Sequence, residues 1–174
     1  MGQTASSIFT MGSPDIDIMF SDQLPDLDIA KSYYGIDFDT FSVAMFHPVT
    51  TEANFMKEYA QHFVDALLKD HHNYVVIFPN NDNGSHHIIK AYEILKNNDR
   101  FKVFPSLRFE YFLTLLKNSQ FIIGNSSAGI REAPYYGIPV INIGTRQQNR
   151  AVHSTIINTT YEEIEKENYL KAID

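Results

Sequence analysis

The sequence predicts an α/β protein built on an open, doubly wound parallel sheet. Short β-rich runs alternate with amphipathic helical patterns along most of the chain, and several of those runs are almost continuously apolar. Strands that are apolar on both faces are typical of a parallel sheet covered by helices on both sides. This alternation forms right-handed βαβ units, whose sheets bind ligands at the carboxyl ends of the strands.

Length and composition fit one soluble domain spanning residues 1–174. The chain has 174 residues, of which 44% are hydrophobic and 20% charged, as in ordinary globular proteins. A net charge of −7 argues against nucleic acid as a general partner, because such binding needs a basic face. The absence of cysteine excludes disulfides and thiolate metal sites.

The chain carries no membrane or export signal that the sequence reveals. Its apolar runs are too short to span a bilayer, and the start "MGQTASSIF" lacks the basic and apolar parts of a secretory signal. We therefore expect a cytoplasmic protein without a membrane partner.

Six runs are expected to form strands. In chain order they are 7–12 (SIFTMG), 41–47 (FSVAMFH), 74–80 (YVVIFPN), 101–107 (FKVFPSL), 120–125 (QFIIGN) and 139–144 (PVINIG).

Helices are expected between these runs. Apolar residues recur at helical spacing over 52–70, where Thr50 or Thr51 can cap the start, and over 85–98 and 108–118. A shorter helix should begin near residue 128 and stop at Gly137. The tail, 160–174, has the pattern of a polar surface helix, whereas 15–39 is acidic and predicts loop plus a short helix.

Two of the strand-end loops carry side chains that could serve chemistry. His47 ends a strand in "FHPVTTE" and can donate to an anionic oxygen, act as an acid or base, or be a plain turn histidine. Asn80 and Asp82 lie in the turn-rich "FPNNDNGS", which is more simply a loop and helix cap. Neither adjacent histidine pair, 71–72 or 86–87, predicts a metal site, because neighbouring helical residues diverge by about 100°.

The stretch "FIIGNSSAGIREAP" predicts an anion site at a strand-to-helix turn. Its glycines have the wrong spacing for a nucleophile elbow, and it lacks the lysine of a Walker loop. A helix N-terminus with the hydroxyls of Ser126 and Ser127 can still bind phosphate. Glu132 suits ribose hydroxyls or simple capping of the helix, and the serines could likewise be plain N-caps.

An arginine follows the last of the expected strands. Arg146, in "VINIGTRQQNR", is a natural partner for phosphate, or else an ordinary surface ion-pair residue.

Taken together, "FHPVTTE", "FPNNDNGS", "GNSSAGIREAPYYGIPVINIGTRQ" and the early "GSPDIDIM" resemble the hydrolysing UDP-N-acetylglucosamine 2-epimerases of sialic- and legionaminic-type sugar synthesis. The resemblance spans nearly the whole chain, and "GTRQ" favours the hydrolysing over the non-hydrolysing branch. It implies a Rossmann-like C-terminal, UDP-binding domain, one half of a GT-B type fold, whose N-terminal domain is absent and with it several carboxylates and histidines of the epimerisation.

The resemblance also assigns roles. His47 matches a histidine that reaches the phosphates and assists departure of the leaving group, and Asn80 matches a nucleotide-pocket asparagine. Ser126 and Ser127 match the serines that hold the diphosphate. Glu132 matches the acid that binds ribose, and Arg146 an arginine beside the nucleotide; Asp82 is held only as a neighbour of the pocket.

The reaction that the resemblance implies converts UDP-N-acetylglucosamine and water to N-acetylmannosamine and UDP, with no cofactor and no metal. The isolated chain is expected to be inactive, its partners being a UDP-sugar and its own N-terminal domain, with a homo-oligomer left open. Three alternatives remain at this point: a non-hydrolysing epimerase domain, a non-catalytic nucleotide-sugar binding module, and an α/β-hydrolase using Ser126 or Ser127.

Overall fold

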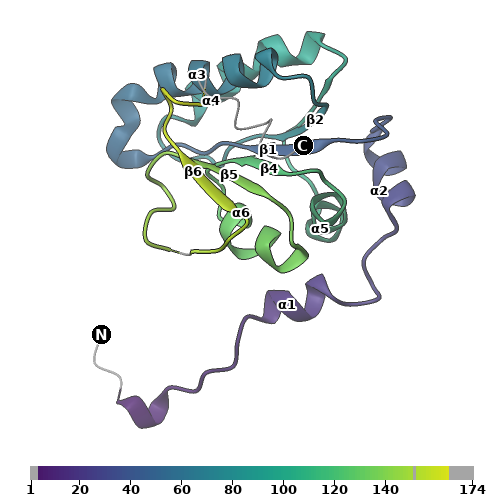
Figure 1. Ribbon diagram of the computed structural model, residues 1–174, viewed down its shortest axis with the longest axis vertical. Coiled ribbons are helices and arrows are strands. Elements are labelled where there is room, and N and C mark those ends of the chain that lie inside the picture. The colour runs from purple at the N-terminus through teal and green to yellow at the C-terminus, as the bar shows by residue number, and fades with distance from the viewer. Residues whose placement is uncertain (1–3, 151, 165–174) are drawn as a thin grey trace.

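A six-stranded, all-parallel sheet forms the centre of the computed structural model, which describes residues 4–150 and 152–164 (Figure 1). The strand order is β3-β2-β1-β4-β5-β6, which confirms the predicted doubly wound, Rossmann-like class. The strands are β1 (Ser42–Met45), β2 (Tyr74–Ile77), β3 (Phe101–Phe104), β4 (Ile122–Gly124), β5 (Val140–Ile143) and β6 (Ile156–Thr159).

Helices cover both faces of the sheet, each over its own apolar core. On one face lie α3 (Met56–Lys69) and α4 (Ser85–Tyr92). On the other lie α2 (Leu27–Tyr34), α5 (Phe109–Lys117) and α6 (Ala128–Arg131), with α1 (Pro14–Met19) contributing its last residue to the core there. This two-sided burial explains the apolar runs: Val43 faces one core and its neighbour Ala44 the other.

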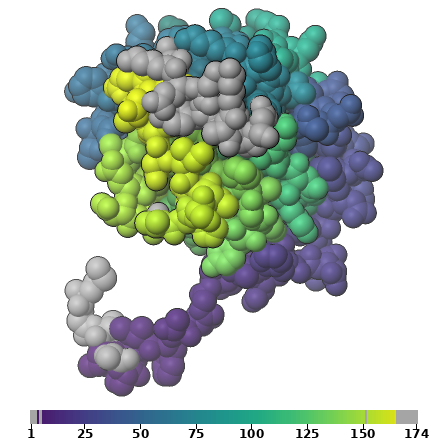
Figure 2. All heavy atoms as spheres, in the orientation of Figure 1, coloured from purple at the N-terminus to yellow at the C-terminus, as the bar shows by residue number. Residues whose placement is uncertain are grey.

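The expected strand at 7–12 is wrong. Residues 5–7 form a short 3₁₀ turn, η1 (Ala5–Ser7), and an irregular segment follows up to α1. Figures 1 and 2 show this N-terminal arm extending away from the body, and the side chain of Phe9 is 84% exposed. A β-rich run forms a strand only when a neighbouring strand supplies hydrogen bonds and packing, and the arm has neither.

One strand was missed. The short run at β6 pairs in parallel with β5 and lies at the edge of the described sheet, where three of its four residues are only partly buried or exposed. Its two isoleucines, Ile156 and Ile157, were the available signal, but polar neighbours at Thr155 and Asn158 shorten the apolar run below a recognisable length.

The expected helices occur with altered ends. A 3₁₀ segment, η2 (Thr50–Phe55), precedes α3, so the helix is capped by neither Thr50 nor Thr51; its N-cap is Phe55. The expected helix 85–98 is α4 followed by η3 (Glu93–Asn97), and 128–137 divides into α6 and η4 (Ala133–Tyr136). Residues 165–174 of the expected tail helix lie outside the described residues.

Candidate functional site

The candidate site lies where the strand order reverses. Strands β1 and β4 are neighbours at the centre of the sheet, and the loops after them leave toward opposite sides of it. In doubly wound sheets the usual ligand position is outside the carboxyl ends of such a strand pair, and we call this place in the chain the crevice. His47 follows β1 after one intervening residue, and Asn125 follows β4 directly.

Asn125 ties the loops around this crevice together. Its Oδ1 accepts from the His47 N–H at 2.7 Å, and its Nδ2 donates to the His47 carbonyl at 2.8 Å. Its own carbonyl accepts from Arg146 Nη1 at 3.1 Å and from Gln147 Nε2 at 2.8 Å. Because Asn125 is completely buried, these bonds satisfy groups that water does not reach, and they fix the loops after β1, β4 and β5 relative to one another.

The close approach of β4 to β1 requires the glycine before Asn125. Gly124 has φ +135°, and a Cβ there would lie 2.0 Å from the Met45 carbonyl oxygen. The Asn125 N–H donates to that same oxygen at 3.1 Å. The first two residues of "GNSS" therefore build the junction between the strands before the serines contribute anything.

The His47 ring is held in one neutral form. The Asn80 backbone N–H donates to His47 Nδ1 at 3.1 Å, so the neutral ring carries its proton on Nε2. Burial, together with the positive charge of Arg146, lowers the pKa of His47 to about 4. At neutral pH this side chain is therefore a hydrogen-bond donor without a charge.

Asn80 contributes its backbone here, while its side chain turns elsewhere. Its Nδ2 donates to Asp82 Oδ2, and both residues are exposed. The structure thus places Asp82 in the same loop, near enough to His47 and Arg146 to act electrostatically on both.

The two serines follow directly at the start of α6. Ser126 is buried, and its Oγ accepts from the Ala128 N–H at 3.3 Å, whereas Ser127 is partly exposed. The helix has only four residues, so the macrodipole expected there is small. Glu132, expected inside the helix, instead follows its last residue, and the dipole argument for its position is wrong.

Arg146 supplies positive charge to the crevice. Its side chain is partly buried. Burial, and to a smaller extent the charge of Arg150, lowers the pKa of Arg146, but the guanidinium remains charged at neutral pH. Arg146 and the His47 Nε2–H thus border a crevice that favours an anion, and Arg150 is close enough to act on Arg146.

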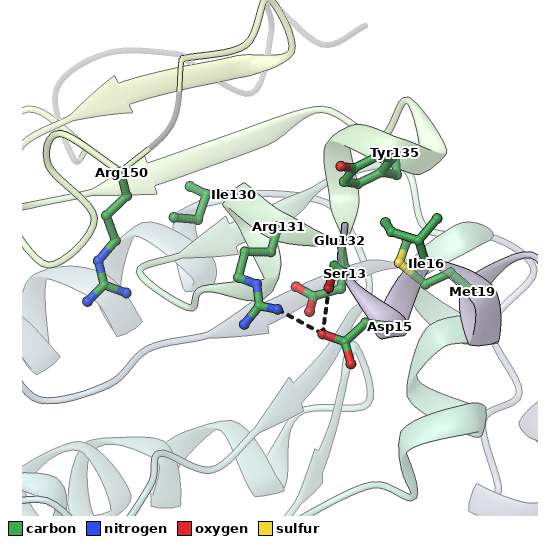
Figure 3. A pocket seen from close by; sticks show the side chains of 9 residues that line it. All are labelled: Ser13, Asp15, Ile16, Met19, Ile130, Arg131, Glu132, Tyr135 and Arg150. Atoms are coloured by element: carbon green, nitrogen blue, oxygen red, sulfur yellow. Dashed lines mark hydrogen bonds and ion pairs between the residues drawn. The ribbon is translucent and has the colours of Figure 1, made fainter. Parts of the chain in front are cut away.

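Glu132 lies in an adjoining pocket of about 430 Å³ between α1 and α6 (Figure 3). Arg131 points to Asp15, with 2.7 Å between Nη2 and Oδ2, and its charge also acts on the Glu132 carboxyl, whose pKa it lowers. Glu132 Oε2 is buried without a hydrogen-bond partner, and burial raises the pKa of this carboxyl. An orphaned buried carboxylate oxygen is suited to a ligand that brings hydroxyl donors.

The structure therefore brings together most, but not all, of the expected residues. His47, Asn80 and Arg146 meet around Asn125, with Ser126 and Ser127 next in sequence, whereas Glu132 faces the adjoining pocket, which Arg150 also lines. Sequence reasoning missed Asn125 and Gln147, although both stand inside the motifs that it singled out. Their signal would have been a polar side chain directly after a buried strand or in the loop beyond it.

The described residues contain no cluster of three or more histidines, aspartates or glutamates placed to hold a metal ion. None of the helices within residues 4–150 and 152–164 has the length and apolar character that a bilayer span requires.

Comparison with known proteins identifies the family. A family model described as UDP-N-acetylglucosamine 2-epimerase matches residues 1–172. The chain belongs to the UDP-N-acetylglucosamine 2-epimerase family.

Two relatives of this chain differ in their identity to it and in the sugar nucleotide that they are named for. It is 51% identical over 163 residues to a UDP-N-acetylglucosamine 2-epimerase of Neisseria meningitidis serogroup B, covering 93% of this chain and 43% of that protein. It is 29% identical over 167 residues to a UDP-N,N'-diacetylbacillosamine 2-epimerase (hydrolyzing) of Legionella pneumophila, covering 94% and 44%. The chain thus spans less than half the length of these relatives.

Solved structures of epimerases share the fold. S. aureus MnaA in its co-structure with UDP matches with a TM-score of 0.66 at 20% identity, over 99% of this chain and 46% of that one. A UDP-GlcNAc 2-epimerase from Neisseria meningitidis bound to UDP-GlcNAc matches with a TM-score of 0.64 at 17% identity, over 84% and 40%. At such identities the likeness concerns the fold of this epimerase-family chain.

Proposed function

We propose that this chain is the UDP-binding, C-terminal domain of a hydrolysing UDP-N-acetylglucosamine 2-epimerase. The observation that carries the proposal is the crevice around Asn125, where a buried asparagine joins three strand-end loops beside His47 and Arg146. The family membership and the co-structures of epimerases with UDP and UDP-GlcNAc support the choice of ligand.

The diphosphate binds in the crevice. Arg146 neutralises its charge, while Ser126 and Ser127 contribute hydroxyl donors from the start of α6. His47 donates from Nε2, because the Asn80 N–H occupies Nδ1. Asn80 therefore acts on the nucleotide through His47, as a positioning residue.

The ribose binds at Glu132. The buried Oε2 lacks a protein donor, and two vicinal ribose hydroxyls would supply it with hydrogen bonds. Binding would then stabilise the ionised carboxylate, whose formation burial opposes in the free domain. Arg150, which lines the same pocket, adds positive charge between the ribose and the diphosphate.

In the proposed reaction, the sugar loses its C2 proton and the C1–O bond to the diphosphate breaks, leaving a glycal-like intermediate. Water adds to this intermediate and gives N-acetylmannosamine, with UDP as the other product. The residues of this chain stabilise the negative charge that develops on the departing diphosphate. His47 does so as a donor, since its low pKa leaves little imidazolium to act as an acid at neutral pH.

The base at C2 lies outside this chain, in a second Rossmann-like domain of the full-length enzyme. This proposal agrees with the 43% of the Neisseria relative's length that the chain covers. We expect the isolated chain to release no UDP from UDP-N-acetylglucosamine. Steady release by the purified chain would contradict the proposal that the base lies in a second domain.

The hydrolysing branch is supported by relatives named as hydrolysing, at 29% identity for the Legionella protein. The 51% identical Neisseria relative carries no such qualifier, so the non-hydrolysing reaction is the second candidate. The two differ in their products when the full-length enzyme acts on UDP-N-acetylglucosamine. We expect free N-acetylmannosamine and UDP in equal amounts, whereas UDP-N-acetylmannosamine without UDP release would establish the non-hydrolysing reaction.

A further inference from the structure

A second pocket opens at the carboxyl ends of β5 and β6, and the proposed nucleotide site does not use it. Its volume is about 550 Å³, within the range of small-molecule sites. We call it the β5–β6 end pocket. Its described lining comes from the end of β6, the loops after β5 and β6, the segment before α3 and α3 itself. The residues that matter below are Glu52, Tyr59, Gln147, Thr159 and Tyr161.

Three nearly buried side chains of this lining have polar atoms whose hydrogen bonding is incomplete. These atoms are Gln147 Oε1, Thr159 Oγ1 and Tyr161 Oη, on residues that are only 3%, 6% and 4% exposed, and the neighbouring side chain of Asn125 acts on Tyr161 Oη. Glu52 Oε2 is likewise buried and unpaired. Orphaned buried polar atoms are rare in folded proteins, and four of them in the lining of one pocket indicate hydrogen bonds that a ligand completes.

The charge of the pocket selects the class of ligand. Glu52, Glu162 and Glu163 line it, and its described lining contains no lysine, arginine or histidine. An anion such as phosphate is therefore disfavoured, in contrast to the crevice beside Arg146. The free groups are two acceptors, on Gln147 and Glu52, and two hydroxyls, so they match a ligand that carries several hydroxyl or amide donors.

The aromatic wall of the pocket does not favour a flat ligand. The rings of Tyr59 and Tyr161 stack on each other with centroids 3.7 Å apart, so a face of each ring is already covered. Burial and the nearby Glu52 raise the pKa of Tyr161 above the ordinary range, which keeps its hydroxyl protonated. The tyrosine hydroxyl is thus a neutral donor and acceptor, as sugar binding requires.

We propose that the β5–β6 end pocket binds an uncharged, hydroxyl-rich sugar through Glu52, Gln147, Thr159 and Tyr161. The pocket adjoins the crevice through Gln147, whose Nε2 donates to the Asn125 carbonyl while its Oε1 is left for the ligand. Two sources share this chemistry, a free monosaccharide and the sugar of a bound nucleotide sugar. Only the second source depends on the function proposed above.

The test is a nuclear magnetic resonance titration of the 174-residue chain with N-acetylglucosamine, with N-acetylmannosamine and, as a charged analogue, with glucuronate. We expect saturable shifts at Gln147, Thr159 and Tyr161 with at least one neutral sugar at about 10 mM, and none there with glucuronate. The absence of saturable shifts with both neutral sugars would overturn the proposal, as would equal binding of glucuronate.

Two variants sharpen the test. Tyr161→Phe and Thr159→Val each remove one orphaned hydroxyl and should weaken sugar binding about fivefold, while leaving the free protein as stable or more stable. The control is Tyr92→Phe, which removes another unpaired buried hydroxyl from the core away from the pocket and should leave binding unchanged. Unchanged sugar binding in both pocket variants would contradict the assignment.

UDP and UDP-N-acetylglucosamine distinguish the two sources. If UDP-N-acetylglucosamine shifts the crevice and the pocket together and displaces the free sugar, the pocket takes the sugar of the nucleotide sugar. If it shifts the crevice alone while free sugar still shifts the pocket, the pocket is a separate sugar site. Failure of UDP to bind the crevice would overturn the proposed function and leave a free-sugar site standing.

Discussion

The two strand-end sites of this domain differ in charge and in how completely their polar groups are paired. At the crevice, Asn125 satisfies both backbone groups of His47, and two cationic side chains stand nearby. In the β5–β6 end pocket the lining is acidic, and four polar atoms have no partner. The same loop, residues 145–150, contributes to both. The contrast shows two ways to prepare a binding site. The backbone of the crevice is already fixed in a position that suits an anion, whereas the β5–β6 end pocket has polar atoms that can still form hydrogen bonds with a neutral ligand.

The largest expected effect comes from the residue that brings β1 and β4 together. Gly124→Ala places a Cβ 2.0 Å from the Met45 carbonyl oxygen at φ +135°, so we expect a loss of about 3 kcal/mol or more in the free energy of unfolding. Gly137→Ala is the matched control, since its φ is +71° but a Cβ there meets no atom within 4 Å; about 1 kcal/mol is expected. Urea unfolding measures both, and equal losses would refute the claim that close approach requires Gly124.

The second-largest expected effect comes from replacing Asn125, the residue that joins the loops of the crevice. Asn125→Ala leaves the His47 N–H and carbonyl without partners in a buried place, at a cost of about 2–4 kcal/mol in the free energy of unfolding. Asn118→Ala removes an exposed amide that donates to the Thr114 carbonyl, and should cost less than about 1 kcal/mol. A loss of stability as small as that of the Asn118 variant would mean that the loops do not depend on Asn125. The crevice would then not be fixed in advance, and the difference between the two sites would disappear.

The difference in charge between the crevice and the β5–β6 end pocket is tested by measuring the affinity for UDP. Arg146→Gln should weaken UDP binding at least about tenfold, because a partly buried cation beside the diphosphate is lost. Arg108→Gln is the control, as its guanidinium lies over the Tyr33 ring, 5.5 Å from its centroid, and does not border the crevice. Isothermal titration calorimetry compares the two, and an unaffected Arg146 variant would remove the main basis for an anion site.

The smallest effect is a change in the titration of His47. In the free domain its pKa of about 4 lies below the ordinary 6.5, so the unfolded chain binds the proton more readily, and stability falls as pH drops from about 6.5 toward 4. Bound diphosphate favours the charged ring and should raise this pKa by about half a unit. Ring nuclear magnetic resonance follows both, and a pKa near 6.5 in the free domain would show that the ring is not buried beside Arg146.

Much of this could be predicted from the sequence because continuous apolar runs and Gly/Asn/Ser turns have strong physical causes. Five strands, their parallel pairing and the positions of His47 and Arg146 after strand ends follow from them. The prediction of a strand at residues 7–12 was wrong because their β propensity forms a strand only beside a pairing partner, which this segment lacks. The strand β6 was missed because an edge strand needs few apolar residues.

The site was predicted less completely than the fold. A turn residue such as Asn80 can contribute its backbone instead of its side chain, and no sequence pattern distinguishes the two. Asn125 was passed over because burial of a polar side chain depends on distant loops that meet only in the folded chain. The orphaned atoms of Gln147, Thr159 and Tyr161 are likewise visible only in three dimensions.

The most direct test of the central claim is calorimetric titration of UDP into the 174-residue chain and into its Glu132→Gln variant. We predict one UDP per chain, with affinity lowered about tenfold in the variant, because an amide replaces the orphaned carboxylate that accepts the ribose hydroxyls. No binding at millimolar UDP, or equal binding by both proteins, would contradict the nucleotide site as described.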